Sequence, residues 1–128
     1  MSFLLLSPEQ VEALHDLALN PGELSGRAKD KSLEGALSRV DNRLLYGMIE
    51  DVFDLAAAYA AAVAQGHCFN DGNKRTAYRT MLVCLTLNDI AITHDTEEVG
   101  QKIIALAQGR LAEEDLADWL RGKAIQTD

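Results

Sequence analysis

Apolar side chains recur at steps of three and four residues along most of this chain, and that periodicity is the feature that most limits its fold. Over 45–63 the apolar residues keep the spacing of one buried stripe on a helix: Leu45, Ile49, Val52, Ala56, Tyr59 and Val63. The alanines at 56–58 and 60–62 add helix propensity and let neighbouring helices approach closely. Because the alternating pattern of a strand appears nowhere convincingly, the sequence predicts an all-α fold.

Capping signals divide the first third of the chain. Ser7-Pro8-Glu9-Gln10 combines a cap, a proline in the first turn and a capping-box glutamine, which predicts a helix from about Pro8 to Leu19. Its inward residues are expected to be Val11, Leu14 and Leu17. Asn20-Pro21-Gly22 breaks this helix, and an irregular segment should continue to Lys31. A short helix is then expected around Leu33, Leu37 and Val40.

The later helices are bounded in the same way. Gly66 is placed to end the long helix in a left-handed conformation, from which His67 would emerge. A buried helix should run from Asn73 or Lys74 to about Asn88, because its segment 81–85 is apolar on nearly all sides. Asp95 caps a further helix that Gly109 closes. The last helix has Glu113 and Glu114 in its first turn, Leu116, Trp119 and Leu120 facing inward, and Gly122 as its stop. These signals predict a compact bundle of about six helices, forming a single domain over 1–128.

Composition excludes several classes of function. The net charge of −8 makes nucleic acid a poor partner, since the surface repels phosphates. The short apolar start and the lack of a long apolar run predict neither a signal peptide nor a membrane span, and hence a cytoplasmic protein. Cys68 and Cys84 have no paired spacing, so we expect reduced thiols rather than a disulfide or a zinc site. Packing as a small apolar residue is favoured for Cys68 over a reactive thiol.

The segment 66–76, Gly-His-Cys-Phe-Asn-Asp-Gly-Asn-Lys-Arg-Thr, concentrates the residues that can do chemistry. Lys74, Arg75 and Arg79 reverse the acidic character of the chain at this one place, which indicates a pocket for an anion. If Gly72 and Asn73 turn into a helix, the free N–H groups of its first turn and the helix dipole complete a phosphate cradle.

His67 and Asp71 could then supply catalysis. A histidine that titrates near neutral pH can take a proton from a hydroxyl, and a carboxylate beside a triphosphate suits Mg²⁺. Simpler alternatives stay open: His67 as a structural residue, Asp71 as a cap of the next helix, and Lys74 and Arg75 as solvated charges. His15 and Asp16 are interpreted as structural, because neighbouring helix residues point about 100° apart.

This segment is not a Walker A loop, because Asn73 stands where that motif needs glycine before the lysine. The pattern His-x-Phe-x-Asp-Gly-Asn-Lys-Arg resembles the signature of the Fic/Doc superfamily, and in particular its death-on-curing branch. The resemblance extends over essentially the whole chain, through Leu14-His15-Asp16, the glycine-rich segment before Leu33, the alanine-rich helix and Asp118-Trp119-Leu120.

The resemblance implies a toxin of a toxin–antitoxin pair that uses ATP and Mg²⁺ to phosphorylate a threonine of translation elongation factor Tu. Its cognate antitoxin would insert a helical segment into a surface groove. The resemblance implies that His67 is the general base and that Asp71 is the Mg²⁺ ligand. It also implies that phosphate is bound by Asn73, by the cations Lys74 and Arg75, and by the Gly72 backbone as part of the anion hole, while Phe69 packs inward as an anchor.

Two departures separate this chain from the adenylylating Fic enzymes. Lys74 replaces the second glycine of Gly-Asn-Gly-Arg, and Tyr78 stands where those enzymes carry a second arginine. Arg79 lies one position later and receives no role. Two other functions remain as alternatives: a nucleotidyltransferase of the same fold, and a non-catalytic module that binds a phosphorylated ligand. Lys74 argues against the first of these, and the presence of both His67 and Asp71 argues against the second.

Overall fold

The computed structural model describes residues 2–125 and contains six helices in that range, with no named strand. The helices are α1 (Pro8–Ala18), α2 (Leu33–Leu45), α3 (Val52–Gly66), α4 (Asn73–Leu87), α5 (Thr96–Ala107) and α6 (Glu113–Lys123). The expected all-α bundle is therefore confirmed. No helix among the described residues is long and apolar enough to cross a membrane.

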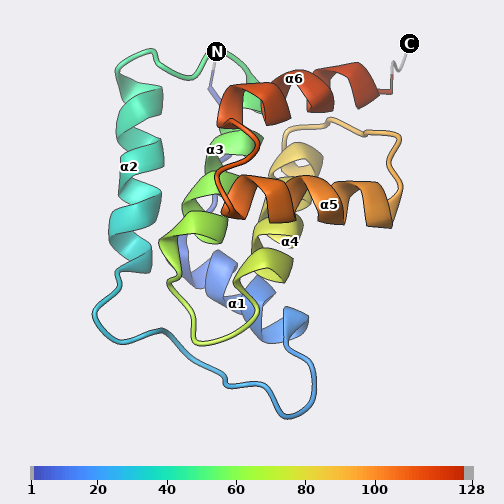
Figure 1. The fold of residues 1–128 in the computed structure, drawn as a ribbon. Helices are drawn as coiled ribbons and strands as arrows, with labels where there is room; N and C mark the ends of the chain where they lie inside the picture. Colours follow the sequence, from blue (N-terminus) through green and yellow to red (C-terminus); the bar gives the residue numbers. More distant parts are fainter. Residues whose placement is uncertain (1, 126–128) are drawn as a thin grey trace.

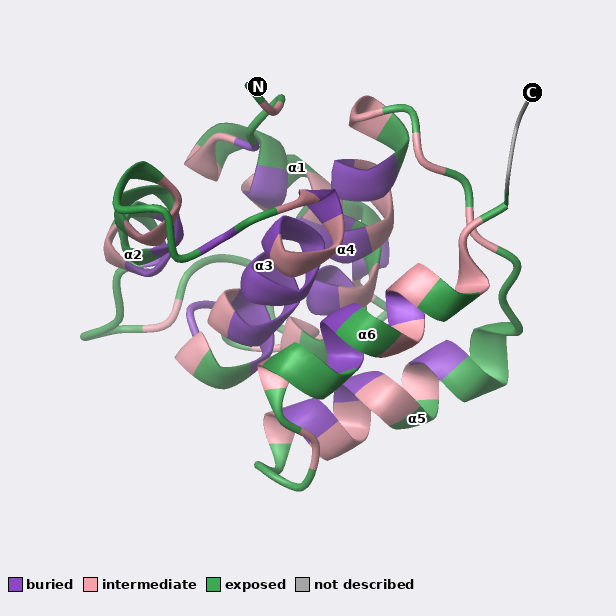
Figure 2. Cartoon of the chain, turned by 90° about the horizontal axis from the view of Figure 1, so that it is seen from above, coloured by how far each residue is buried: buried purple, intermediate pink, exposed green. Residues whose placement is uncertain are grey.

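Helix α3 lies at the centre of the bundle and packs against α2, α4, α5 and α6 (Figure 1). Six of its alanines are buried, so the helices around it can approach its backbone closely. Buried residues gather where α3 faces α4 (Figure 2). Helix α1 closes the far side of α4.

The connection between α2 and α3 corrects the continuous stripe expected from Leu45 onward. Leu45 is the last residue of α2, and α3 begins only at Val52, capped by the Asp51 side chain, which accepts from the Asp54 N–H. Between the helices Gly47 turns the chain with φ 74°. Ile49 is nevertheless buried, which is why the apolar spacing runs on through residues that are not helical.

Helix α1 has the predicted capping box, but its buried face differs from the expected one. Val11, His15 and Ala18 face the core at the spacing i, i+4, i+7, whereas the Leu17 side chain is 70% exposed. The expectation that Leu17 faces inward is wrong. The helix turns a histidine inward because that residue has a specific partner in the connection between α3 and α4.

One expectation for the last helix is corrected, and a second is met only in part. Gly122 lies within α6, which ends at Lys123. Trp119 is only half-buried, and its ring lies 5.5 Å from the Lys102 Nζ and 5.6 Å from the Lys123 Nζ. The ring therefore packs against the edge of the core and is also placed for cation–π contacts at the surface.

Candidate active site

His67 is the first residue after α3 and adopts the left-handed conformation, with φ 49° and ψ 40°. The sequence predicts this conformation for Gly66, which is instead the last helical residue. A Cβ at position 66 would lie 3.0 Å from the Cys68 Sγ, so a larger residue there would require the buried Cys68 side chain to move. His67 leaves the turn with an exposed side chain, as a base that must reach a second molecule requires.

The loop after His67 is fixed by the irregular segment between α1 and α2, which runs beside it at the lower end of the bundle in Figure 1. The Ala28 N–H donates to the Cys68 carbonyl at 2.8 Å, and the Asn70 N–H donates to the Gly26 carbonyl at 3.1 Å. Segment 20–31 is thus irregular, as expected, but it also serves as one wall of the loop.

Phe69 and His15 form the inner anchor of the loop. Phe69 is buried, as the family resemblance implies, and its ring stacks on the His15 imidazole with centroids 3.9 Å apart and planes 7° apart. The His15 Nε2 lies 2.7 Å from the Asp71 carbonyl oxygen. His15 was not predicted to take part in this site, although a buried stripe of Val11, His15 and Ala18 would have indicated it.

Asp71 does not cap α4, so the capping alternative is wrong. The N-cap is Gly72, with φ 79°, and no side chain caps the N–H groups at the start of the helix. The Asp71 Oδ2 instead accepts from the Leu24 N–H at 2.8 Å. The first-turn N–H groups of α4 are therefore without a side-chain cap, as an anion-binding helix start requires.

Asn73 uses its side chain within the loop. Its Nδ2 donates to the Phe69 carbonyl at 2.9 Å, and its Oδ1 accepts from the Phe69 N–H at 3.1 Å. The phosphate contact implied for Asn73 by the resemblance would require this amide to exchange one of these bonds.

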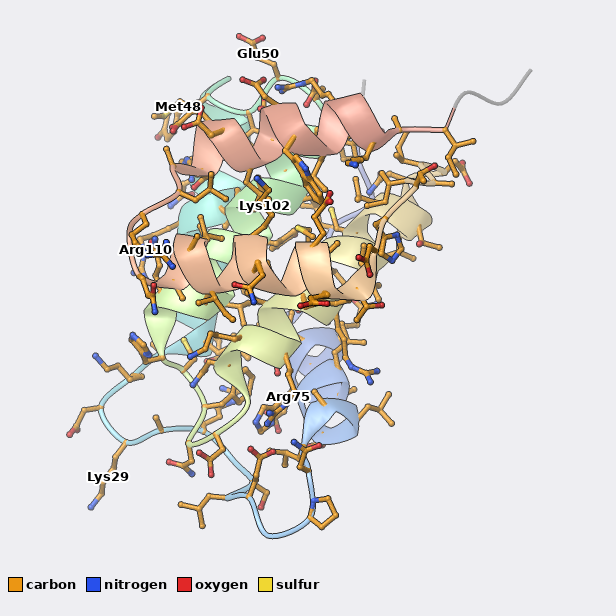
Figure 3. The ribbon with its side chains drawn as sticks, turned by 45° about the vertical axis from the view of Figure 1, so that its right-hand side comes forward. Lys29, Met48, Glu50, Arg75, Lys102 and Arg110 are labelled. Atoms are coloured by element: carbon orange, nitrogen blue, oxygen red, sulfur yellow. The ribbon has the colours of Figure 1, made fainter. Side chains whose placement is uncertain are left out.

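The two motif cations differ in their surroundings. The Arg75 side chain lies beside α1 toward the lower end of the bundle (Figure 3). Its Nε donates to the Ala18 carbonyl at 3.0 Å, and its Nη2 pairs with Glu23. Arg75, together with the Asn20 N–H, holds the pKa of the Glu23 carboxyl below its usual range. Within residues 2–125, Lys74 is exposed and forms no ion pair. Arg75 is thus held in a set orientation, whereas Lys74 is free to meet an anion.

A groove of about 730 Å³ begins at these cations and runs between α1, α4 and α5. Its walls are mainly apolar and include Leu14, Leu17, Leu82, Ile103 and Ile104. Lys74, Arg75 and Arg79 stand among its lining residues, whereas His67 and Asp71 do not. Leu82 and Val83, expected as pure core, are half-buried residues of this groove.

Both cysteine side chains are buried in the core. Cys68 and Cys84 are both buried and unpaired by any disulfide, and burial raises the pKa of each thiol. Packing as small apolar residues is therefore confirmed for them.

In the described part of the chain, no group of three or more His, Cys, Asp or Glu side chains could hold a metal ion, so Asp71 stands as a single carboxylate.

Sequence comparison identifies relatives of this chain. The family model described as "Fic/DOC family" matches residues 5–85, which include the whole loop and most of α4. The chain is 37% identical over 117 residues to "Protein kinase doc" of Escherichia phage P1, covering 91% of this chain and 92% of that protein. The chain therefore belongs to the Fic/DOC family.

Proposed function

We propose that this protein is the toxin of a toxin–antitoxin pair and a kinase that transfers the γ-phosphate of ATP to a serine or threonine hydroxyl, with translation elongation factor Tu as its target. The observation that carries the proposal is the placement of Lys74 and Arg75 in the uncapped first turn of α4, seven and eight residues beyond an exposed His67. The name of its phage P1 relative, a protein kinase, supports transfer of phosphate in particular.

In the proposed reaction, His67 accepts the proton of the target hydroxyl as its oxygen attacks the γ-phosphorus. A bond forms between that oxygen and phosphorus, the bond from the γ-phosphorus to the β,γ-bridging oxygen breaks, and ADP leaves. Arg75 is pre-oriented by Ala18 and Glu23, while Lys74 supplies a mobile positive charge. Both cations and the Gly72 N–H would stabilise the negative charge on the transferred group.

Asp71 fits the proposed Mg²⁺ site. One of its oxygens accepts from Leu24, while the other has no hydrogen-bond partner in the described chain. A single carboxylate is a common protein contribution to Mg²⁺, whose other ligands are phosphate oxygens and water. When bound, the ion would neutralise part of the charge on ATP, and Asp71 would orient the nucleotide through it.

The groove between α1, α4 and α5 is the proposed site for the antitoxin. Its apolar walls suit the apolar face of an amphipathic helix, and its three basic residues suit acidic side chains on that helix. A helix seated there would cover Lys74 and Arg75 and so block access of the nucleotide. Because the target is a cytoplasmic translation factor, the toxin would act in the cytoplasm.

The test is incubation of the purified protein with a translation extract and ATP labelled at either the α- or the γ-phosphate. Transfer of γ-label alone to protein supports the kinase. Transfer of α-label would identify a nucleotidyltransferase instead. ATP binding without transfer of either label would identify a binding module.

A further inference from the structure

We infer that His15 is a positioning residue of this site: from α1 it fixes the peptide plane between Asp71 and Gly72, and thereby aims the Gly72 N–H at the phosphate. The inference rests on the proposed function and adds to it a residue outside the motif. His15 and Asp71 are 56 residues apart in the sequence.

The hydrogen bond and the aromatic stack of His15 are both directed at the loop. Its side chain is fully buried, its ring lies flat against Phe69, and its Nε2 lies 2.7 Å from the Asp71 carbonyl oxygen. A carbonyl oxygen only accepts, so the Nε2 must carry the proton and donate. His15 therefore contacts the loop at two points, the Phe69 ring and the Asp71 backbone.

The other ring nitrogen shows that packing alone does not account for this residue. The His15 Nδ1 is buried and has no hydrogen-bond partner, since the Asp16 Oδ1 is 3.7 Å away. A buried polar atom without a partner destabilises the fold, whereas phenylalanine would fill the same space without that cost. The bond to Asp71 is the one interaction that phenylalanine could not provide.

That bond determines the direction of the next amide. A trans peptide is planar, so its C=O and N–H point in opposite directions. With the Asp71 carbonyl held toward His15, the Gly72 N–H must point away from His15 and out of the core. Gly72 has the left-handed φ of 79° that this turn needs, and its N–H precedes the uncapped first turn of α4.

His15 also supports the other end of the same turn. Phe69, held by the ring stack, is the residue whose N–H and carbonyl are bound by Asn73. Loss of the His15 donor should therefore leave Phe69 in place but let the Asp71–Gly72 peptide rotate. A rotated amide would face the phosphate with a carbonyl oxygen, which repels it.

Two substitutions separate the stack from the hydrogen bond. His15→Phe keeps an aromatic ring against Phe69 and removes the donor, whereas His15→Gln loses the ring but places an amide donor near the position of Nε2. Val11→Ala is the matched control, because Val11 is fully buried one turn earlier on the same face of α1. Melting temperature, kcat for γ-phosphate transfer and KM for ATP are measured for each.

We expect His15→Phe to melt at or above the parent and to lose about 10²-fold in kcat, the scale of loss from misplacing a catalytic group by about 1 Å. His15→Gln should melt lower than His15→Phe yet retain more activity. Val11→Ala should melt lower with little change in kcat. Activity that follows melting temperature across the set, or full activity of His15→Phe, would overturn the inference.

A readout without catalysis separates this inference from the proposed function. In ¹⁵N-labelled parent protein, the Gly72 amide signal should shift on addition of ATP with Mg²⁺, and in His15→Phe that shift should be lost. If the parent moves no phosphate but this difference is seen, the kinase proposal is wrong and the role of His15 stands. An equal shift in both proteins, or none in the parent, refutes the role of His15.

Discussion

The Asn73 side-chain amide bonds to both backbone groups of Phe69, accepting from its N–H at 3.1 Å and donating to its carbonyl at 2.9 Å. The first residue of α4 thus closes the loop that the last residues of α3 open. These two hydrogen bonds explain the asparagine at position 73, because they require a side chain that carries both a donor and an acceptor.

Asn73→Ala should lower the free energy of unfolding by about 1–3 kcal/mol, from two half-buried hydrogen bonds of about 0.5–1.5 kcal/mol each. Urea unfolding measures the change, and Asn70→Ala serves as control because that exposed loop amide makes a single bond to the Ser25 carbonyl. Unchanged stability of Asn73→Ala together with weaker ATP binding would show instead that this amide contacts phosphate.

His67→Asn should reduce phosphate transfer by about 10²–10⁴-fold, the usual contribution of a general base. Asparagine tolerates the left-handed conformation of residue 67, so the fold should be kept and the melting temperature should change little. His94→Asn, at an exposed histidine elsewhere, should leave transfer unchanged. Comparable transfer by the His67 and His94 variants would remove His67 from the mechanism.

Asp71→Asn should weaken the dependence of ATP binding on Mg²⁺ without destabilising the protein. The asparagine oxygen can still accept from the Leu24 N–H, but it lacks the charge that Mg²⁺ prefers in a ligand. Calorimetric titration with ATP over a range of Mg²⁺ concentrations, alongside melting curves, tests both parts. A lower melting temperature with unaltered Mg²⁺ dependence would make Asp71 a structural support of segment 20–31.

Lys74→Gly and Lys74→Ala should both reduce γ-phosphate transfer by about 10–100-fold, the equivalent of one charge-assisted hydrogen bond of about 1.5–3 kcal/mol. Alanine favours the helix in the first turn of α4, whereas glycine is less favourable there by about 1 kcal/mol. Steady-state kinetics compares them. Should only the glycine variant lose activity, the helix start rather than the charge of Lys74 would be responsible.

Cys84 should give stability a specific dependence on alkaline pH. Burial raises the pKa of its thiol from 9.0 to about 12. As the pH rises, the unfolded chain therefore loses this proton before the folded protein does. The contribution of the protonated thiol to the free energy of unfolding is complete below about pH 9 and is lost as the pH rises toward 12.

Urea unfolding between pH 8 and 10.5 measures that dependence, and Cys84→Ala should weaken it. Tyr59, whose pKa burial also raises to about 12, remains in both proteins and is cancelled by the comparison. Parallel pH profiles of parent and variant would contradict the assignment. In the native protein, both thiols should also be unreactive toward a disulfide reagent at pH 8.

The helices could be predicted because each carries its own signals. The Ser7 capping box, the Asp95 cap and the uninterrupted apolar run of α4 are local features, and the structure has them where they were expected. The boundary between α2 and α3 was missed because Ile49 is buried from a loop. A buried apolar residue in a loop continues the helical spacing of apolar residues, so the spacing does not reveal where α2 ends and α3 begins.

The site could be predicted only as far as its residues are contiguous. The motif from His67 to Arg75 lies at the predicted connection between two helices, but the partners that hold it come from distant segments: His15 in α1, Glu23 and Leu24 in the loop that follows. Nothing in the local sequence marks a tertiary hydrogen bond to a backbone carbonyl. The position of the groove could not be predicted either, because Leu17 and Leu82 have the pattern of core residues although both line the groove.

The most direct test of the proposed activity is the intact mass of purified elongation factor Tu after incubation with this protein, ATP and Mg²⁺, with His67→Asn run in parallel. The kinase proposal predicts a gain of one phosphoryl group on a serine or threonine with the parent, and no gain with the variant. A gain of one AMP group, or an unchanged mass with a fully folded parent protein, would contradict it.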